Sequence, residues 1–246
     1  MRVIISFILL TVIVADQRHF INTYETIMLE PQEAEIEFYY INVFPTLNIA
    51  DNQDLNTLKL QVEIEIGMSE FLEVSFYNTF KEYPLFLTFP DDDDVFIGRQ
   101  FKYDEYKLRL KYKVFKNTNP WTPLFYSELR GKPDFSSWTL EQKLIFTKYF
   151  GNINLSINPI IEFENEKNDD QWEREFEAEL AMGVAFLKEH YSFGFDMKSS
   201  EYATYLGPVF AHGNEDKWWS IGLMKKVAGE EIKNELIIKS IMGFHF

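Results

Sequence analysis

The stretch "YKLRLKYKV" (Tyr106–Val114) alternates strictly between two kinds of side chain. Aromatic or aliphatic residues occupy its even positions, and Lys or Arg occupies positions 107, 109, 111 and 113. A period of two residues predicts a β-strand with one apolar face and one cationic face. In a soluble protein the apolar face would need a core to cover it, so the rest of the chain must indicate what that cover is.

Composition and charge exclude several classes of function. The chain has 246 residues, with 39 acidic against 24 basic side chains and a formal net charge of −15. Nucleic acid is therefore not an expected partner, because binding phosphates requires a basic surface. The absence of cysteine excludes disulfides, thiolate metal sites and thiol nucleophiles. The length suits one large β-barrel domain.

The N-terminus has the pattern of a secretory signal peptide over residues 1–15. Arg2 precedes an apolar run from Val3 to Val14, which ends at Ala15 and the polar Asp16. A transmembrane helix needs ~20 apolar residues, so this run is too short to cross a bilayer comfortably. A buried first strand or an uncleaved anchor is the alternative.

Two-residue alternation recurs along residues 33–246, with polar, glycine or proline punctuation between the segments. It predicts twelve strands, at residues 34–44, 57–67, 71–80, 103–115, 122–130, 138–150, 152–164, 172–187, 191–198, 204–212, 217–227 and 235–246. The connections after even-numbered strands are mostly short, and several of those after odd-numbered strands are long and acidic. Such alternation is typical of an up-and-down membrane barrel. Ten or fourteen strands stay open, because residues 81–102 could contain a hairpin.

The apolar faces of twelve strands are best covered by lipid. A barrel of ~8 strands is about as wide as side chains can fill, so twelve apolar faces pointing inward would leave a void. We therefore expect an all-β fold, a transmembrane antiparallel up-and-down barrel with a polar lumen. All five tryptophans fall at starts of predicted strands, where an aromatic belt would place them.

Several segments resemble a known family. They are "VEIEIGMSEFLEVSF" (62–76), "KYDEYKLRLKYKV" (102–114), "GNINLSINPIIEFE" (151–164) and "YLGPVFAHGNEDKWWSIGLM" (205–224). Together they resemble the outer-membrane transporters grouped with the MetA-pathway phenol-degradation proteins. The resemblance implies a barrel for small solutes in the outer membrane of a Gram-negative bacterium. In the same way, the terminal Phe246 resembles the signal by which the barrel-assembly machinery recognises its substrates.

The polar faces of the strands supply the candidate pore-lining residues. These are Lys107, Arg109, Lys111 and Lys113 on one strand, Glu63 and Glu65 on another, and Glu173, Glu175, Glu177 and Glu179 on a third. The basic and acidic rows would oppose each other across the lumen, and an excess of acids there predicts a weak preference for cations. Equally, these charges could pair into a network that braces a closed lumen.

The N-terminal segment, residues 16–32, is either periplasmic or a plug inside the lumen. A loosely held tail is the first expectation, because terminal segments are usually poorly ordered.

The predicted function is a channel or transporter for small solutes, with lipids of the outer membrane and the barrel-assembly machinery as partners. No enzyme activity, catalytic residue, cofactor or metal is expected. The acidic stretch "PDDDD" (90–94) lacks the spaced ligands of a calcium loop. A lipid-modifying enzyme is an alternative because His190 and Ser192 are two residues apart, although no third group to orient them is evident. A closed structural or adhesion barrel is the other alternative.

Overall fold

The computed structural model describes residues 18–45, 57–89, 92–114, 122–168, 171–214, 216–229 and 235–246. The predicted signal peptide (1–15) and Trp121 lie outside the described residues. So do Pro90 and Asp91 of the acidic stretch, together with the side chains of its other three residues.

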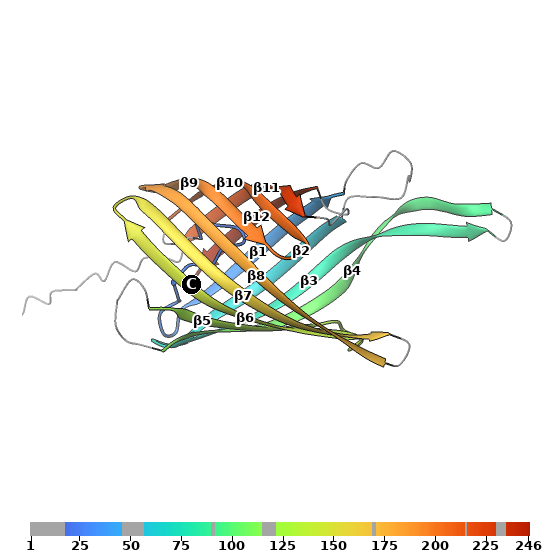
Figure 1. Cartoon of the computed structure of the whole chain (residues 1–246), viewed down its shortest axis with the longest axis horizontal. Helices are drawn as coiled ribbons and strands as arrows, with labels where there is room; N and C mark the ends of the chain where they lie inside the picture. The colour runs from blue at the N-terminus through green and yellow to red at the C-terminus, as the bar shows by residue number, and fades with distance from the viewer. Residues whose placement is uncertain are drawn as a thin grey trace, which may run out of the picture.

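The described chain forms twelve strands (Figure 1). They are β1 (Ala34–Phe44), β2 (Thr57–Ser69), β3 (Leu72–Phe89), β4 (Asp92–Lys113), β5 (Leu124–Gly131), β6 (Ser137–Phe150), β7 (Ile153–Asn168), β8 (Gln171–Lys188), β9 (Tyr191–Ser199), β10 (Ala203–Gly213), β11 (Lys217–Gly229) and β12 (Leu236–His245). The predicted all-β class and strand number are confirmed. In the described part of the chain, no helix has the length and apolarity needed to cross a membrane.

Each strand pairs antiparallel with its neighbours in sequence, and β1 pairs with β12 to close the barrel. The closing register sets Ile36 opposite Phe244 and Phe38 opposite Met242. Beyond the last paired residues, the amide of Phe246 donates to the carbonyl of Ala34 over 2.8 Å. Closure of this kind leaves no strand edge without a backbone partner along the seam.

The two faces of the barrel wall differ in polarity as the alternation predicts. On β2, Glu63 is 0 % exposed and its neighbour Ile64 is 45 % exposed. On β4, Arg109 is buried, whereas Leu108 and Leu110 lie on the exposed face. The barrel therefore carries its polar groups inside and its apolar groups outside, which is the polarity expected of a barrel surrounded by lipid.

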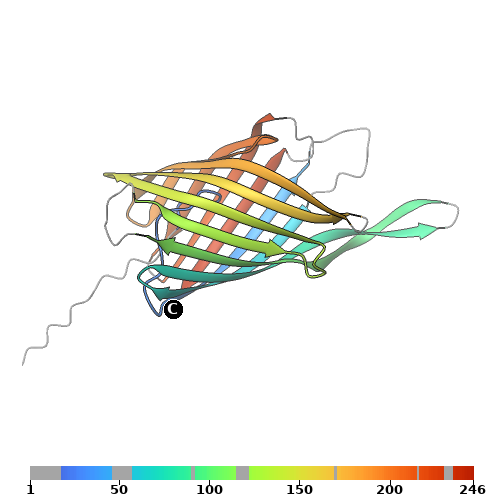
Figure 2. The same ribbon diagram turned by 60° about the horizontal axis from the view of Figure 1, so that its bottom comes forward.

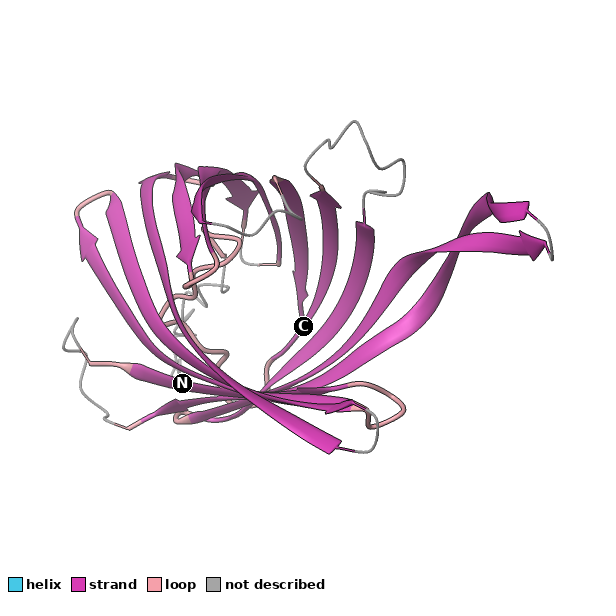
Figure 3. Cartoon of the chain, turned by 45° about the vertical axis from the view of Figure 1, so that its right-hand side comes forward, coloured by secondary structure: helices cyan, strands magenta, loops and turns pink. Residues whose placement is uncertain are grey.

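The β3–β4 hairpin differs from the sequence prediction. Most of residues 81–102, expected as a long loop, instead extend the two strands, which remain paired as far as Phe89 and Asp92. Figure 3 shows this hairpin reaching far beyond the other strands. The alternation is weak there because both faces of the hairpin lie outside the closed barrel.

Trp218 also differs from the prediction. Trp218 and Trp219 are adjacent on β11, so their side chains must point to opposite faces of the sheet. Trp219 is 37 % exposed on the outer face, but Trp218 is 2 % exposed and donates from Nε1 to Glu35 Oε1 over 2.7 Å. Only one of the two can belong to an outer aromatic belt.

Candidate functional site

The lumen contains a buried ion-pair cluster centred on Arg109. Its guanidinium Nη2 lies 2.8 Å from Glu63 Oε1 and 3.2 Å from Glu73 Oε1, and it also contacts Glu65. The ammonium of Lys111 lies 2.8 Å from Glu73 and 3.5 Å from Glu65. All five side chains are buried, so this cluster fills part of the lumen with paired charges.

Strand register explains why these groups meet. Residues 63 and 65 are on β2, residue 73 is on β3, and the bases are on β4, so three neighbouring strands supply the cluster. Glu65 is opposite Ser75, which is itself opposite Arg109. The basic row is therefore neutralised by the strands beside it. The basic side chains therefore do not produce the electric field across the pore that was expected from a basic row facing an acidic row.

The other members of the basic row are less enclosed. Lys107 Nζ lies 3.5 Å from Glu105 and 3.6 Å from Glu128, and its side chain is 15 % exposed. Lys113 is half-buried at the end of β4.

The acidic row on β8 extends out of the enclosed lumen. Glu179 contacts Lys198 over 2.7 Å, and Glu177 is half-buried. Glu173 and Glu175 are exposed, as is every residue from 171 to 176, because this end of β8 pairs with β7 but projects past β9. Glu175 accepts a hydrogen bond of 2.5 Å from the hydroxyl of Tyr202. The structure does not bring this acidic row against the basic row.

The N-terminal segment, here residues 18–33, lies mostly inside the barrel (Figure 2, dark blue). Residues 18–29 are buried or half-buried, whereas residues 30–32 are exposed, and Gln32 and Glu33 bond to the backbone of Gly67.

The best-anchored part of the segment is held by one carboxylate of the wall, Asp196 on β9. Asp196 accepts hydrogen bonds from the amides of Ile21 (3.1 Å) and Asn22 (2.6 Å) and from the hydroxyl of Thr23 (2.5 Å). A buried acceptor with three donors fixes both the place and the direction of the segment.

Polar side chains of other strands continue this anchoring along the segment. Asn158 accepts from the amide of Tyr24 over 2.5 Å and donates back to the Tyr24 carbonyl over 3.0 Å. Thr147 accepts from the amide of Thr26 over 2.9 Å. A backbone that forms no strand has thus found its hydrogen-bond partners in the barrel wall.

Apolar contacts add to the docking. Phe20 and Ile21 are 0 % exposed and pack with Ala185, Val209 and Met224. Two wall glycines make room for these side chains, since a Cβ at Gly183 would collide with Phe20 and one at Gly222 would collide with Ile21. Glycines on the lumen face of β8 and β11 therefore leave the space in which the segment packs.

His19 and Glu25 form an ion pair within the segment. The ring nitrogen Nδ1 of His19 lies 2.9 Å from Glu25 Oε1, and the His19 amide donates to Glu25 Oε2 over 2.9 Å. Asn154 on β7 also donates to Glu25. Burial by itself raises the pKa of Glu25, but the charge and hydrogen bonds of His19 and the hydrogen bond of Asn154 outweigh it, so the pKa lies below its ordinary value.

A loose tail was expected over residues 18–32, but the structure binds most of this segment to the barrel wall. Terminal segments are loose when nothing binds their backbone, and here the wall does. Sequence reasoning did not identify Asp196 as an anchor. No local signal could have revealed that role, because the donors precede it by more than 170 residues.

The suggested His190 and Ser192 pair is not assembled. Ser192 is 1 % exposed on the lumen face of β9, and its hydroxyl has no hydrogen-bond partner among the described residues. His190 is exposed in the turn before β9. An imidazole outside the lumen cannot act as the base for a hydroxyl inside it.

Two carboxylate triplets in the described chain are compact enough to share a cation. They are Glu37, Glu63 and Glu65, and Glu141, Glu162 and Glu179. In the first triplet Arg18 contacts Glu37, and Arg109 contacts the other two acids. In the second, Glu141, Glu162 and Glu179 each contact a base. Basic side chains therefore already neutralise these acids.

Comparison with solved structures identifies the fold class. The chain is similar to the COG4313 outer membrane channel from Pseudomonas putida F1, with 9 % identity and a TM-score of 0.63 over 92 % of this chain and 100 % of that one. It is also similar to the NanC porin, with 10 % identity and a TM-score of 0.52 over 87 % of this chain and 98 % of that one. The chain has the fold of an outer-membrane β-barrel.

No protein-family model matches the sequence, and no curated protein matches it significantly. The resemblance to the transporters grouped with phenol-degradation proteins stays an expectation from the sequence. At identities near 10 % the structural likeness describes the fold and leaves the activity to be argued from the lumen.

Replacing Arg109 with Met tests the ion-pair cluster. The change leaves three buried carboxylates without their shared guanidinium, and we expect the free energy of unfolding in urea to fall by about 3–5 kcal/mol. Lys113→Met is the matched control, since it removes a half-buried base from the end of the same row, and it should cost less than about 1 kcal/mol. Equal losses from the two variants would show that the cluster contributes nothing special.

Acid should release the N-terminal segment. Because the docked pKa of Glu25 lies below 4.5, its ordinary value, the carboxylate stabilises docking fully above that value, and the stabilisation is lost as the pH falls through the docked pKa. A spin label at Ile27→Cys, a half-buried position of the segment and the sole cysteine of that variant, should become mobile as the pH falls below 4.5. Adding Glu25→Gln should remove the pH-dependent step; a step of unchanged size would contradict this origin.

Proposed function

We propose that the protein is a channel for small solutes in the outer membrane of a Gram-negative bacterium, held closed in this conformation by residues 18–33. The observation that carries the proposal is the way the lumen is filled. Strand side chains alone do not fill it; a separate segment occupies it through side-chain hydrogen bonds such as those to Asp196. Residues 18–29 are held by side chains of the wall and not by strand pairing, so they can leave while the barrel stays closed on itself.

The wall that the segment covers is mainly polar. Asn154, Ser156 and Asn158 of β7 are 0 % exposed, and they alternate with outward-facing apolar residues. Departure of the segment would expose these groups to water, which suits a path for hydrated solutes. The excess of lumen acids supports a weak preference for cations. No catalytic role is included in the proposal.

The proposed setting has three further parts. Residues 1–15 direct export across the inner membrane, the barrel-assembly machinery recognises the end of β12 at Phe246, and membrane lipids surround the apolar outer face. Phe246 is 73 % exposed while its backbone pairs with Ala34, which leaves the ring accessible as a recognition signal.

A closed structural barrel is the second candidate. It is favoured by the Arg109 cluster, which belongs to the strands themselves and would stay in the lumen after the segment left. The two candidates predict opposite outcomes when the segment is released.

Single-channel recording in planar bilayers separates them. Asp196→Ala removes three hydrogen bonds to a buried carboxylate, worth ~3 kcal/mol together, and should raise the open probability roughly a hundredfold. Glu177→Ala is the control, because it removes an acid from β8 six residues before Gly183, where Phe20 packs. It should leave the open probability unchanged.

A reversal potential that favours cations would support the acidic lumen. A folded Asp196→Ala barrel that conducts no more than the intact protein would refute the channel and favour the structural barrel.

A further inference from the structure

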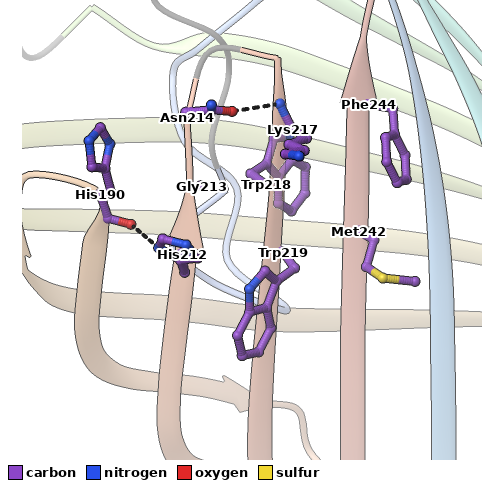
Figure 4. A pocket seen from close by; sticks show the side chains of 9 residues that line it. All are labelled: His190, His212, Gly213, Asn214, Lys217, Trp218, Trp219, Met242 and Phe244. Carbon is purple, nitrogen blue, oxygen red and sulfur yellow. Dashed lines mark hydrogen bonds between the residues drawn. The ribbon is translucent and has the colours of Figure 1, made fainter.

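A hollow of about 300 Å³ lies on the outer surface of the barrel, at the end where β8 turns into β9 and β10 turns into β11 (Figure 4). Its wall is apolar where it meets the barrel, with Trp219, Met242 and Phe244 on the outward faces of β11 and β12. Polar groups stand at its rim, on the turns. The hollow is therefore apolar toward the middle of the strands and polar toward their ends.

The polar rim includes Lys217, Asn214 and His212. Lys217 is exposed at the start of β11, and its amide donates to Asn214 Oδ1 over 3.1 Å, which fixes the turn. His212 Nδ1 donates to the carbonyl of His190 over 3.0 Å, and the His212 ring stacks on Tyr191 at 4.5 Å. The other ring nitrogen of His212, Nε2, then has no hydrogen-bond partner among the described residues. An ammonium and an imidazole at one rim can bind a phosphate oxygen.

A second, larger hollow of about 770 Å³ continues along the same strands. On β10 it covers residues 208–210 where the first covers 212–214, and on β11 it covers 221–223 where the first covers 217–219. The ring of Phe210 joins the two, at 5.3 Å from Trp219 and 4.9 Å from Phe193. The hollows thus lie end to end along the strands.

The larger hollow is apolar for a clear local reason. Pro208 presents only a short ring on the outer face of β10, between the longer side chains of Phe195 and Leu223 on the adjacent strands. The interior-facing neighbours Gly194 and Gly222 add no bulk. The result is a shallow apolar groove on the face that meets hydrocarbon, of a kind that an acyl chain can fill.

We propose that the two hollows bind one glycerophospholipid of the leaflet around the turn end, with its phosphate at Lys217 and His212 and one acyl chain along the groove over Pro208. The site has the same order of groups as such a lipid. The apolar groove corresponds to the acyl chain, the Phe210–Trp219 pair lies between, and the polar rim corresponds to the phosphate. Two exposed acids, Glu189 and Asp216, adjoin His190 and Lys217 in sequence. A headgroup with an ammonium beside its phosphate, such as phosphoethanolamine, therefore fits the rim better than a bare anion. The site does not depend on what the lumen transports.

Native mass spectrometry of the intact protein in detergent, titrated with phosphatidylethanolamine, tests this site. The intact protein should bind one lipid more tightly than any others. Lys217→Ala should weaken that binding about fivefold, since a base near a lipid phosphate contributes ~1 kcal/mol. Pro208→Phe fills the groove and should abolish the tight binding; folding of each variant is checked by its circular dichroism.

Lys148→Ala is the matched control. Lys148 lies on β6 close to the β6–β7 turn, at the same end of the barrel, with its ammonium 4.8 Å from the Phe150 ring, and it lines neither hollow. Its loss should leave the tight binding unchanged. The proposal is overturned if Lys217→Ala binds like Lys148→Ala, or if diacylglycerol, which lacks the phosphate, binds as tightly as the phospholipid.

Discussion

The pairing of every strand with two neighbours is the constraint on which the rest of this structure depends. Hydrocarbon offers no hydrogen bonds to a backbone, so strands that cross it must pair on both sides, and here β1 with β12 completes the ring. A closed ring fixes which face of each strand meets lipid. It also encloses a lumen that twelve strands make too wide for ordinary apolar side chains to fill.

The lumen is filled in two ways that differ in permanence. Around Arg109, acids and bases on adjacent strands neutralise one another, and separating them would leave charges buried without partners. Next to this cluster, the N-terminal segment occupies the space through hydrogen bonds to Asp196 and Asn158 and through Phe20 and Ile21, and its Leu29 amide donates to Glu73 of the cluster over 3.0 Å. The Arg109 cluster is part of the barrel wall, whereas the N-terminal segment is a separate stretch of chain bound to the wall. In the proposed channel, residues 18–29 would leave on opening, while the Arg109 cluster would stay in place.

The sequence predicted the features that depend on neighbouring residues. Alternation in Tyr106–Val114 and in the other strands predicts their number and faces, because side-chain direction repeats every two residues. The partners of Arg109 were not predicted, since they follow from the register of β2 and β3 against β4. The docking of the segment was missed for a similar reason: its anchor, Asp196, is distant in sequence. The extension of β3 and β4 beyond their predicted ends was not foreseen because, outside the barrel, neither face of the hairpin must be apolar.

Amide hydrogen exchange of the folded protein tests the central claim, that residues 18–33 lie docked in the lumen, most directly. The amides of Ile21, Asn22, Tyr24 and Thr26 are bonded to the wall and should exchange orders of magnitude more slowly than in a free peptide. Their protection should fall in Asp196→Ala, while the strand amides stay protected. Exchange of these four amides at the free-peptide rate in a folded barrel would contradict the docked segment and the closed channel built on it.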